Sequence, residues 1–347
     1  MSGPLLSVKD LKKYYAGDRS IIDRLVGEEV DSVKAVDGVS FEVAEGETLG
    51  LVGESGCGKS TTGETVLRLR EATDGQITYD GQNLLEMSDT ELTTFRRRAQ
   101  IVFQDPFSSL DPRMTAGAII SEGLRVHGTE DASQRRETAL DLLENVGLSP
   151  DQIDRYPHEF SGGQRQRIGI ARALAVDPDF VVLDEPVSAL DVSVQAQILN
   201  LLEDLQEQFD LTYLFIAHNL SVVRHICDRV AVMYLGEIVE TGPVDELFED
   251  PAHPYTRALL SSVPRVRSDS REEEFATLPG DVPSPRNPPA GCRFHTRCPK
   301  ARVACRETAP PAYDVGASDD RVATCFRADA DHLYWDSEPI AENPNRS

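Results

Sequence analysis

The chain has 347 residues, of which 59 are acidic and 35 basic, so its formal net charge at pH 7 is −24. This excess of negative charge argues against free nucleic acid or an anionic lipid surface as the main binding partner. No stretch approaches the roughly 18 consecutive apolar residues that span a bilayer, and the first residues lack the pattern of a secretory signal. We therefore expect a cytoplasmic protein with a sizeable core and two domains.

The basic residues are mostly arginine, because only six lysines occur in the whole chain. A diffuse acidic excess with few lysines is typical of adaptation to a high-salt cytoplasm, where screening shortens electrostatic repulsion to a few ångströms. The alternative is an acidic protein from an ordinary cytoplasm. We expect salt adaptation.

Period-two alternation and short apolar runs predict strands at the N-terminal end of the chain, over residues 5–11, 39–43, 48–52 and 76–79. A helix is predicted over 61–69. Ser88 and Glu91 have the spacing of a capping box and mark the start of another helix. Residues 100–104 form a buried strand that ends in a glutamine.

From residue 105 to about 160 the pattern changes to helices, over 116–126, 133–146 and 150–156, so we expect an inserted helical segment. Apolar strands follow at 180–183, 212–217 and 229–234, with helices at 164–176 and 193–207. This repeated strand–helix order predicts an open α/β sheet with crossover connections. Beyond residue 248 the prolines predict an extended, poorly helical connection, with a domain boundary near 250–265 and a frayed C-terminus.

The segment 53–61 fits the pattern G-x-x-x-x-G-K-[ST] of a phosphate-binding loop, with Gly53, Gly58, Lys59 and Ser60 at the defining positions. Glycines let a backbone wrap around a triphosphate, and the N–H groups at the following helix N-terminus then point at phosphate oxygens. Lysine adds a cation for the outer phosphates, and the serine hydroxyl serves Mg²⁺. The predicted strand before the loop and helix after it favour this interpretation over an ordinary glycine-rich turn.

Polar residues also follow the ends of three other apolar strands: Gln104, the pair Asp184 and Glu185, and His218. In a phosphate-loop enzyme, an Asp at such a strand end holds Mg²⁺ through water, and the next carboxylate can orient or deprotonate the attacking water. Without the phosphate loop upstream, the acidic pair would read as a capping turn.

A second glycine-rich helix start lies at Ser161, Gly162, Gly163 and Gln164. It has the character of an anion-binding N-terminus. One ATP needs only one phosphate loop, so this second cradle predicts a nucleotide that is held mainly by a partner ATPase.

With these motifs in this order, residues 5–250 resemble the ATPase subunit of ABC transporters. The resemblance implies a P-loop fold with a parallel core sheet, an antiparallel β subdomain and a helical subdomain at about 105–160. Residues 53–61 resemble Walker A, Gln104 the Q-loop, 161–164 the signature (with Phe160 where the family usually has Leu), 181–185 Walker B, 188–191 the D-loop with Asp191, and His218 the switch histidine. The ATP-binding residues would be Tyr15, Gly53, Glu54, Ser55, Gly56, Cys57, Gly58, Lys59, Ser60, Thr61 and Gln104.

The family's mechanism follows as an implication of the resemblance. Two such cassettes sandwich two ATPs, and each site pairs one chain's phosphate loop with the other chain's signature. Glu185 would polarise the attacking water and His218 would hold the γ-phosphate geometry, while Ser60, Gln104 and Asp184 would serve Mg²⁺. The implied partners are a second ATPase subunit in a heterodimer, two membrane permeases and an extracytoplasmic solute-binding protein. The chain would then lie at the cytoplasmic face of the membrane.

The tail narrows the resemblance further. Residues 253–260 and 291–295, with proline-rich chain between them, resemble the oligopeptide/dipeptide importer ATPases, so we expect a nucleotide-binding domain at 5–255 and an importer-type extension at 256–347. Relatives that share this tail import other solutes, so nickel and sugars stay open as alternatives to peptides. A non-transport ABC ATPase would show two fused cassettes or a long coiled coil, and a module without turnover would not need Glu185 and His218.

Four cysteines lie within the tail: Cys292, Cys298, Cys305 and Cys325. In a cytoplasmic protein, four close thiols are more often metal ligands than disulfides, yet the C-x₂-C pairs of zinc ribbons are missing. Some members of the resembled importer family carry a 4Fe–4S cluster on such a tail. We expect a structural 4Fe–4S cluster, with zinc or free thiols as the alternatives.

Overall fold

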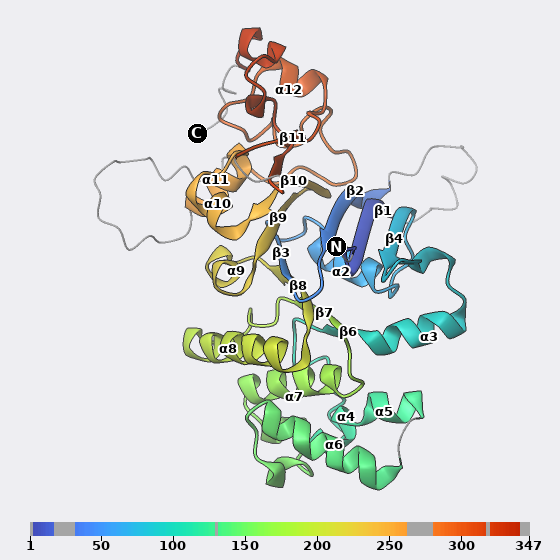
Figure 1. Cartoon of the computed structure of the whole chain (residues 1–347). Coiled ribbons are helices and arrows are strands. Elements are labelled where there is room, and N and C mark those ends of the chain that lie inside the picture. The colour runs from blue at the N-terminus through green and yellow to red at the C-terminus, as the bar shows by residue number, and fades with distance from the viewer. Residues whose placement is uncertain (1–2, 17–31, 129–130, 262–279, 317–319, 341–347) are drawn as a thin grey trace, which may run out of the picture.

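A computed structural model describes residues 3–16, 32–128, 131–261, 280–316 and 320–340. Three parts follow one another along the length of the molecule in Figure 1. A helical part (green) lies at one end, two sheets with their helices form the middle, and the C-terminal extension (orange and red) lies at the other end. The predicted frayed C-terminus falls mostly outside the described residues.

The larger sheet joins eight strands, in the order β11 (Tyr313–Asp314), β12 (Val322–Ala323), β10 (Glu237–Pro243), β9 (Arg229–Tyr234), β3 (Thr48–Val52), β8 (Thr212–Ala217), β7 (Phe180–Asp184) and β6 (Ala99–Val102). The run from β9 to β6 is parallel, and β10, β12 and β11 continue it antiparallel. The carboxyl ends of the parallel strands therefore share one edge, which is where an open α/β sheet places its ligands.

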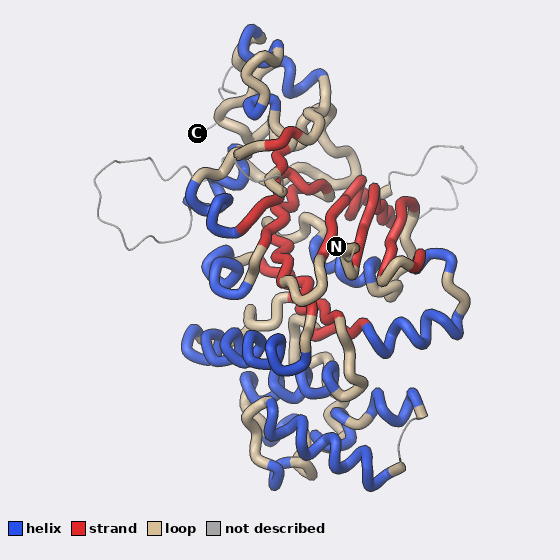
Figure 2. Tube along the Cα trace, in the orientation of Figure 1, coloured by secondary structure: helices blue, strands red, loops and turns tan. Residues whose placement is uncertain are grey.

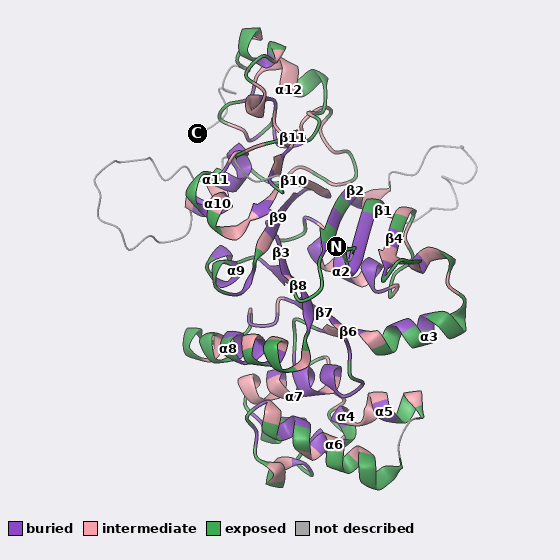
Figure 3. Cartoon of the chain, in the orientation of Figure 1, coloured by how far each residue is buried: buried purple, intermediate pink, exposed green. Residues whose placement is uncertain are grey.

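The smaller sheet is antiparallel, in the order β2 (Val33–Val43), β1 (Leu6–Tyr15), β4 (Asp74–Tyr79) and β5 (Gln82–Asn83). Helix α2 (Lys59–Val66) contacts strands of both sheets. Alternation along β8 shows how the parallel strands divide the interior into two cores: Leu214 and Ile216 join the core shared with the smaller sheet, while Tyr213 and Phe215 join the core covered by helices. Figure 3 shows these strands as buried.

Most of the remaining helices cover the other face of the large sheet or build the helical part, while the helix that begins at Asp89 packs Leu92 and Phe95 into the core shared with the smaller sheet. Their bounds are α3 (Asp89–Arg98), α4 (Ala116–Ile120), α5 (Glu122–His127), α6 (Ala132–Asn145), α7 (Gly162–Leu174), α8 (Val192–Phe209), α9 (Leu220–Ile226), α10 (Val244–Glu249), α11 (Pro254–Ser261) and α12 (Val303–Glu307). Within the helical part, α4 and α6 both pack against α7, and α7 in turn contacts α8. The helical part is thus joined to the sheet through α7.

Two predicted helices differ from the structure. The helix expected over 116–126 is divided at Ser121, whose ψ of 2° lies outside helical geometry; its N–H and its hydroxyl both bond the carbonyl of Gly117. The helix expected over 150–156 is only a 3₁₀ turn, Pro150–Gln152. Tyr156, the residue before Pro157, is extended with a ψ of 156°, so no helix can continue to residue 156.

The expectation of a poorly helical chain beyond residue 248 is wrong for α11. Pro254 is the first residue of that helix, where its missing N–H removes no hydrogen bond and its fixed φ suits the helix. Further along, the extension is mostly loop with short helices and strands, as Figure 2 shows. Its β12 pairs with β10, so the extension is part of the large sheet.

Candidate functional site

The phosphate loop connects β3 to α2 at the carboxyl edge of the parallel sheet. Its glycines are required by close approach: a Cβ at Gly53 would lie 2.1 Å from the Met233 carbonyl oxygen, and one at Gly58 would lie 2.1 Å from that of Ala35. Gly58 also has a φ of +112°, which side chains disfavour. The loop can therefore wrap tightly between the two sheets.

Lys59 is buried, with 5% of its surface exposed, and its ammonium spans the loop. The Nζ atom donates to the carbonyl oxygens of Gly53 at 2.9 Å and Glu54 at 3.2 Å, and lies 4.0 Å from a carboxylate oxygen of Glu185. A buried cation that is held mainly by carbonyls is ready to exchange them for the oxygens of an anion.

Ser60 and Asp184 meet across the same edge. The Ser60 hydroxyl donates to Asp184 Oδ1 at 2.9 Å. Burial raises the pKa of Asp184 above its usual value, the nearby Glu185 charge raises it further, and the Ser60 hydrogen bond opposes both. A carboxylate that is costly to ionise gains from a cation, and carboxylate and hydroxyl oxygens are the ligands that Mg²⁺ prefers. The residues present therefore fit Mg²⁺.

Glu185 is the centre of the hydrogen-bond network. Its Oε2 accepts from Gln104 Nε2 at 3.0 Å and bonds His218 Nδ1 at 2.9 Å. Its φ of +46° turns the chain sharply out of β7. Because β6, β7 and β8 are adjacent and parallel, the residues that follow their ends are brought together. Gln104 itself lies beyond β6, which ends at Val102 and not at 104 as expected.

The two tyrosines at the end of β1 have different surroundings. Burial, together with the hydrogen bond that the Tyr14 hydroxyl donates to Asp37, raises the pKa of Tyr14 to about 12. The Tyr15 ring is flanked by cations, with Lys13 Nζ 5.0 Å and the Arg70 guanidinium 5.6 Å from its centroid. Tyr14 is thus anchored in the fold, which supports Tyr15 as the aromatic platform for a base.

The signature segment caps α7. The Ser161 side chain accepts from the N–H of Gln164 at 3.4 Å, and the Gln164 side chain accepts from the N–H of Ser161 at 2.9 Å, a complete capping box. Ser161 is exposed. Asp191 caps α8 with its side chain alone, accepting from the N–H groups of Ser193 and Val194, and the hydrogen bond from the Ser193 side chain lowers its pKa. In Figure 1, β6 and β7 lie between α7 and α2.

The structure also joins Glu54 of the phosphate loop to residues that the sequence pattern missed. Its N–H donates to the Tyr255 hydroxyl at 2.9 Å, and its carboxylate pairs with Arg297. Arg293 pairs with Asp37 and Glu237. Arg293 lies in the stretch 291–295 that resembles the importer ATPases, whereas the only signal for Arg297 was its place next to Cys298.

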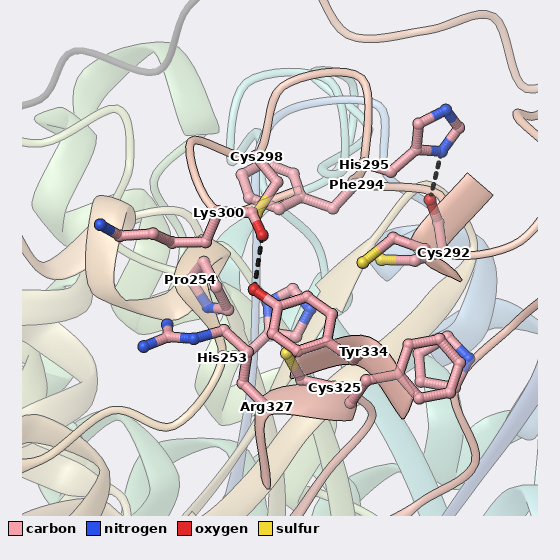
Figure 4. A pocket seen from close by; sticks show the side chains of 13 residues that line it. His253, Pro254, Cys292, Phe294, His295, Cys298, Lys300, Cys325, Arg327 and Tyr334 are labelled. Carbon is pink, nitrogen blue, oxygen red and sulfur yellow. Dashed lines mark hydrogen bonds between the residues drawn. The ribbon is translucent and has the colours of Figure 1, made fainter. Parts of the chain in front are cut away.

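The four tail cysteines line one cavity, together with His253, Phe294 and Tyr334 (Figure 4). Burial raises the pKa of all four thiols, that of Cys298 to about 12. Within the described ranges, no group of three or more His, Cys, Asp or Glu residues is arranged to hold a metal ion. The donor set of four thiols on one cavity matches the Cys₄ ligation of an iron–sulfur cluster in kind.

No helix within the described part of the chain is both long and apolar enough to span a bilayer.

Comparison with known proteins agrees with this geometry. Residues 36–188 match the family model "ABC transporter", and residues 239–305 match "Oligopeptide/dipeptide transporter, C-terminal region". The chain is 55% identical over 316 residues to the oligopeptide transport ATP-binding protein AppF of Bacillus subtilis, covering 90% of this chain and 95% of the relative. It is 50% identical over 327 residues to the dipeptide transport ATP-binding protein DppF of Haemophilus influenzae, covering 94% and 97%.

Among solved structures, a dimeric bacterial ABC transporter cassette is 30% identical, with a TM-score of 0.60 over 69% of this chain and 98% of that one. The same cassette in a post-hydrolysis dimer bound to ADP and Pi is 29% identical, also with a TM-score of 0.60. The predicted α/β class with an ABC ATPase cassette is therefore confirmed. The chain belongs to the ABC transporter family, among the ATP-binding proteins of the oligopeptide/dipeptide transporters.

Proposed function

We propose that this chain is the ATP-hydrolysing motor subunit of an importer for dipeptides or oligopeptides. The observation that carries the proposal is the meeting of Lys59, Asp184, Glu185 and His218 beside the phosphate loop. The names of the relatives support peptides over the nickel and sugar alternatives. The domain limits 5–255 and 256–347 are part of this proposal.

The phosphate loop and its neighbours bind and orient the triphosphate. Lys59 exchanges its two carbonyl partners for phosphate oxygens, and Tyr15 stacks on the base. Ser60, Gln104 and Asp184 would hold Mg²⁺, which supplies charge neutralisation at the phosphate oxygens. The remaining loop residues, Glu54, Ser55, Gly56, Cys57 and Thr61, contribute backbone geometry around the phosphates.

Glu185 is the group that accepts a proton from the attacking water. Its Oε2 is held by both Gln104 and His218, which fixes the carboxylate at the edge where the γ-phosphate would lie. The hydrogen bond between His218 Nδ1 and Glu185 sets the orientation of the ring and leaves the other ring nitrogen for the γ-phosphate. When Gln104 leaves Glu185 to bind Mg²⁺, its hydrogen bond to Glu185 would break. The segment that follows Gln104 leads into the helical part and would pass this change on to it.

A second ATPase subunit completes the site. In the signature, Ser161 is exposed and Gly162, Gly163 and Gln164 are half-buried. The capping box uses the N–H groups of Ser161 and Gln164, so the glycine N–H groups at this helix N-terminus are the ones that would meet an anion on a partner. The dimeric cassettes among the structural neighbours support this arrangement. We place the chain in a heterodimer on the cytoplasmic face of the membrane, with two permeases and an extracytoplasmic solute-binding protein.

The test is Glu185→Gln in the chain assembled with its partner ATPase. Because the amide cannot take up the proton, hydrolysis should fall at least about 100-fold while ATP stays bound in a stable dimer. Release of radiolabelled phosphate measures hydrolysis, and gel filtration with radiolabelled ATP measures the dimer and its bound nucleotide. Glu207→Gln, an exposed change on α8, is the control and should hydrolyse normally. Unchanged turnover of Glu185→Gln would refute the assignment of the base.

The four-cysteine cavity is proposed to hold a 4Fe–4S cluster as a structural staple. The support is that all four cysteines line one cavity, because a 4Fe–4S cluster is ligated by four cysteine thiolates. Such a group would stabilise a loop-rich extension that has little core of its own.

The cluster proposal is tested on protein purified without oxygen. A broad absorbance near about 400 nm that bleaches with dithionite is expected for the native chain and for Cys227→Ser, and absent from Cys298→Ser. Stoichiometric zinc without colour, or four titratable thiols without metal, would refute it.

The acidic excess is proposed to reflect a salty cytoplasm, since a charge of −24 with six lysines repels itself strongly at low salt. Thermal unfolding should shift upward as KCl is raised from about 0.1 M to about 2 M. Replacing the exposed pair Asp204 and Glu207 of α8 with lysine should weaken that dependence. A melting temperature that is independent of salt would contradict the proposal.

A further inference from the structure

The extension contacts the phosphate loop through one arginine. Arg297 donates from Nη1 to Glu54 Oε2 at 2.6 Å and from Nη2 to Glu54 Oε1 at 3.1 Å, a bidentate pair that joins residues 243 positions apart. The Arg297 side chain is 5% exposed and that of Glu54 is 26% exposed. Bidentate geometry and low exposure make this pair stronger than a surface ion pair.

The backbone of Glu54 is held from the same side. Its N–H donates to the Tyr255 hydroxyl at 2.9 Å, and Tyr255 is fully buried against Tyr234 and Phe294, with ring centroids 4.7 and 5.3 Å away. Phe294 lies in the same segment as Arg297, between Cys292 and Cys298. The segment that carries two ligands of the proposed cluster therefore also contacts the phosphate loop, directly through Arg297 and indirectly through Tyr255.

Glu54 is the second residue of the phosphate loop, so its charge belongs to the loop that binds the triphosphate in the proposed function. An unpaired carboxylate there would repel the nucleotide, and the low exposure of the site leaves little water to screen that repulsion. Arg297 neutralises the charge of the Glu54 carboxylate by pairing with both of its oxygens. Holding the loop in one conformation also removes part of the ordering cost of binding.

We infer that Arg297 is a positioning residue for nucleotide binding: it neutralises Glu54 and fixes the phosphate loop from the C-terminal extension. This inference rests on the proposed function, in which the loop at 53–61 binds ATP. It assigns the extension a role in the ATP site of the same chain, in addition to any structural role of the four cysteines.

The test measures the affinity of the purified full-length chain for a fluorescent ATP analogue. Arg297→Gln should weaken binding about tenfold, because it leaves Glu54 charged and unpaired. The double variant Glu54→Gln/Arg297→Gln removes both charges and should recover affinity to within about threefold of the native chain. This recovery distinguishes electrostatic positioning from simple loss of structure.

Arg302→Gln is the matched control. Arg302 also lies in the extension and binds the carbonyls of Trp335 and Ser337, so its loss perturbs the extension without touching the loop. Its affinity should equal that of the native chain. If Arg297→Gln and Arg302→Gln weaken binding equally, or if the double variant binds no better than Arg297→Gln, the inference is wrong.

Arg297→Lys guards against misfolding of the glutamine variant. It keeps the cation but loses the bidentate fork, so affinity should fall only about threefold at an unchanged melting temperature. Lys59→Ala tests the proposed ATP site separately from the role of Arg297. If it does not weaken binding, the proposed ATP site fails; if it abolishes binding while Arg297→Gln and Arg297→Lys bind as the native chain does, only the role of Arg297 fails.

Discussion

The phosphate loop and the signature segment are both glycine-rich helix starts, yet the chain surrounds them in opposite ways. Lys59 behind the first is buried and linked to a network of side chains from four strand ends. Ser161 at the second is exposed and bonds only within its own helix turn among the contacts described. One half-site is completed from within the chain, and the other is built for something that approaches from outside.

The variant with the largest expected effect on the phosphate loop is Lys59→Ala. The phosphate loop should lose affinity for ATP by at least about 100-fold, because the buried cation at the loop is its main positive charge. Equilibrium binding of a fluorescent analogue measures the loss. Lys12→Ala, which removes a half-buried β1 lysine paired with Asp10 and Asp74, should bind normally. Equal affinities for both variants would contradict the assignment of the loop.

Ser161→Arg addresses the other half-site. A bulky cation at the α7 N-terminus should reduce partner-dependent hydrolysis about 100-fold, while ATP affinity of the isolated chain changes less than twofold. Steady-state hydrolysis with the partner, and binding without it, give the two numbers. Ser133→Arg on α6, another exposed helix start in the helical part, is the control. A matching loss of binding in the isolated chain would mean that the half-sites are not separate.

A third prediction concerns the pH dependence of stability behind the phosphate loop. His253 is fully buried beside the cysteine cavity, and its Nδ1 accepts from the N–H of Tyr255, the residue that holds Glu54. Burial lowers its pKa to about 3, whereas the unfolded value is about 6.5.

Because the unfolded state binds the proton first, stability is present above pH 6.5 and is lost as pH falls toward 3. Between pH 7 and pH 5 the loss from His253 should be about 2 kcal/mol. Urea unfolding at the two pH values measures it. His253→Asn keeps an acceptor for Tyr255 and should lose less stability over that interval; an unchanged pH dependence would show that His253 is not the group responsible.

The smallest effect concerns the glycines of α7. A Cβ at Gly163 would lie 2.5 Å from Val194 Cγ1 on α8, so Gly163→Ala should destabilise the fold by about 1–2 kcal/mol. At Gly169 of the same helix nothing lies within 4 Å of an added Cβ, so Gly169→Ala should stabilise it by about 0.5–1 kcal/mol. Unfolding free energies decide. Equal values would mean that the close packing of α7 on α8 does not require this signature glycine.

Much of the site could be predicted because it depends on local patterns in a parallel sheet. The motifs around Lys59, Gln104, Asp184 and His218 each follow a strand, and parallel neighbours place their ends together. The family, the α/β class and the inserted helical segment were all readable for the same reason. The individual site roles stay predictions until the variants above are measured.

What could not be predicted depends on contacts between distant segments or on a balance within one turn. The pair of Arg297 and Glu54 spans 243 positions, and no local pattern marks it. The strand β10 (Glu237–Pro243) was missed because its sequence mixes charged, glycine and proline residues, and it is defined by pairing with β9 and β12. The break at Ser121 lies in the backbone angles of a single residue, and no sequence pattern marks it.

The pairing of β12 with β10 has a consequence for any shortened form of this protein. A fragment that ended at residue 261 would lack β11 and β12, so β10 would present unpaired N–H and C=O groups to solvent. It would also leave the buried carboxylate of Glu240 without Arg321, 3.5 Å away. An edge strand with unpaired backbone groups pairs readily with a strand of another chain. The shortened cassette should therefore self-associate, and light scattering that rises with concentration would show it.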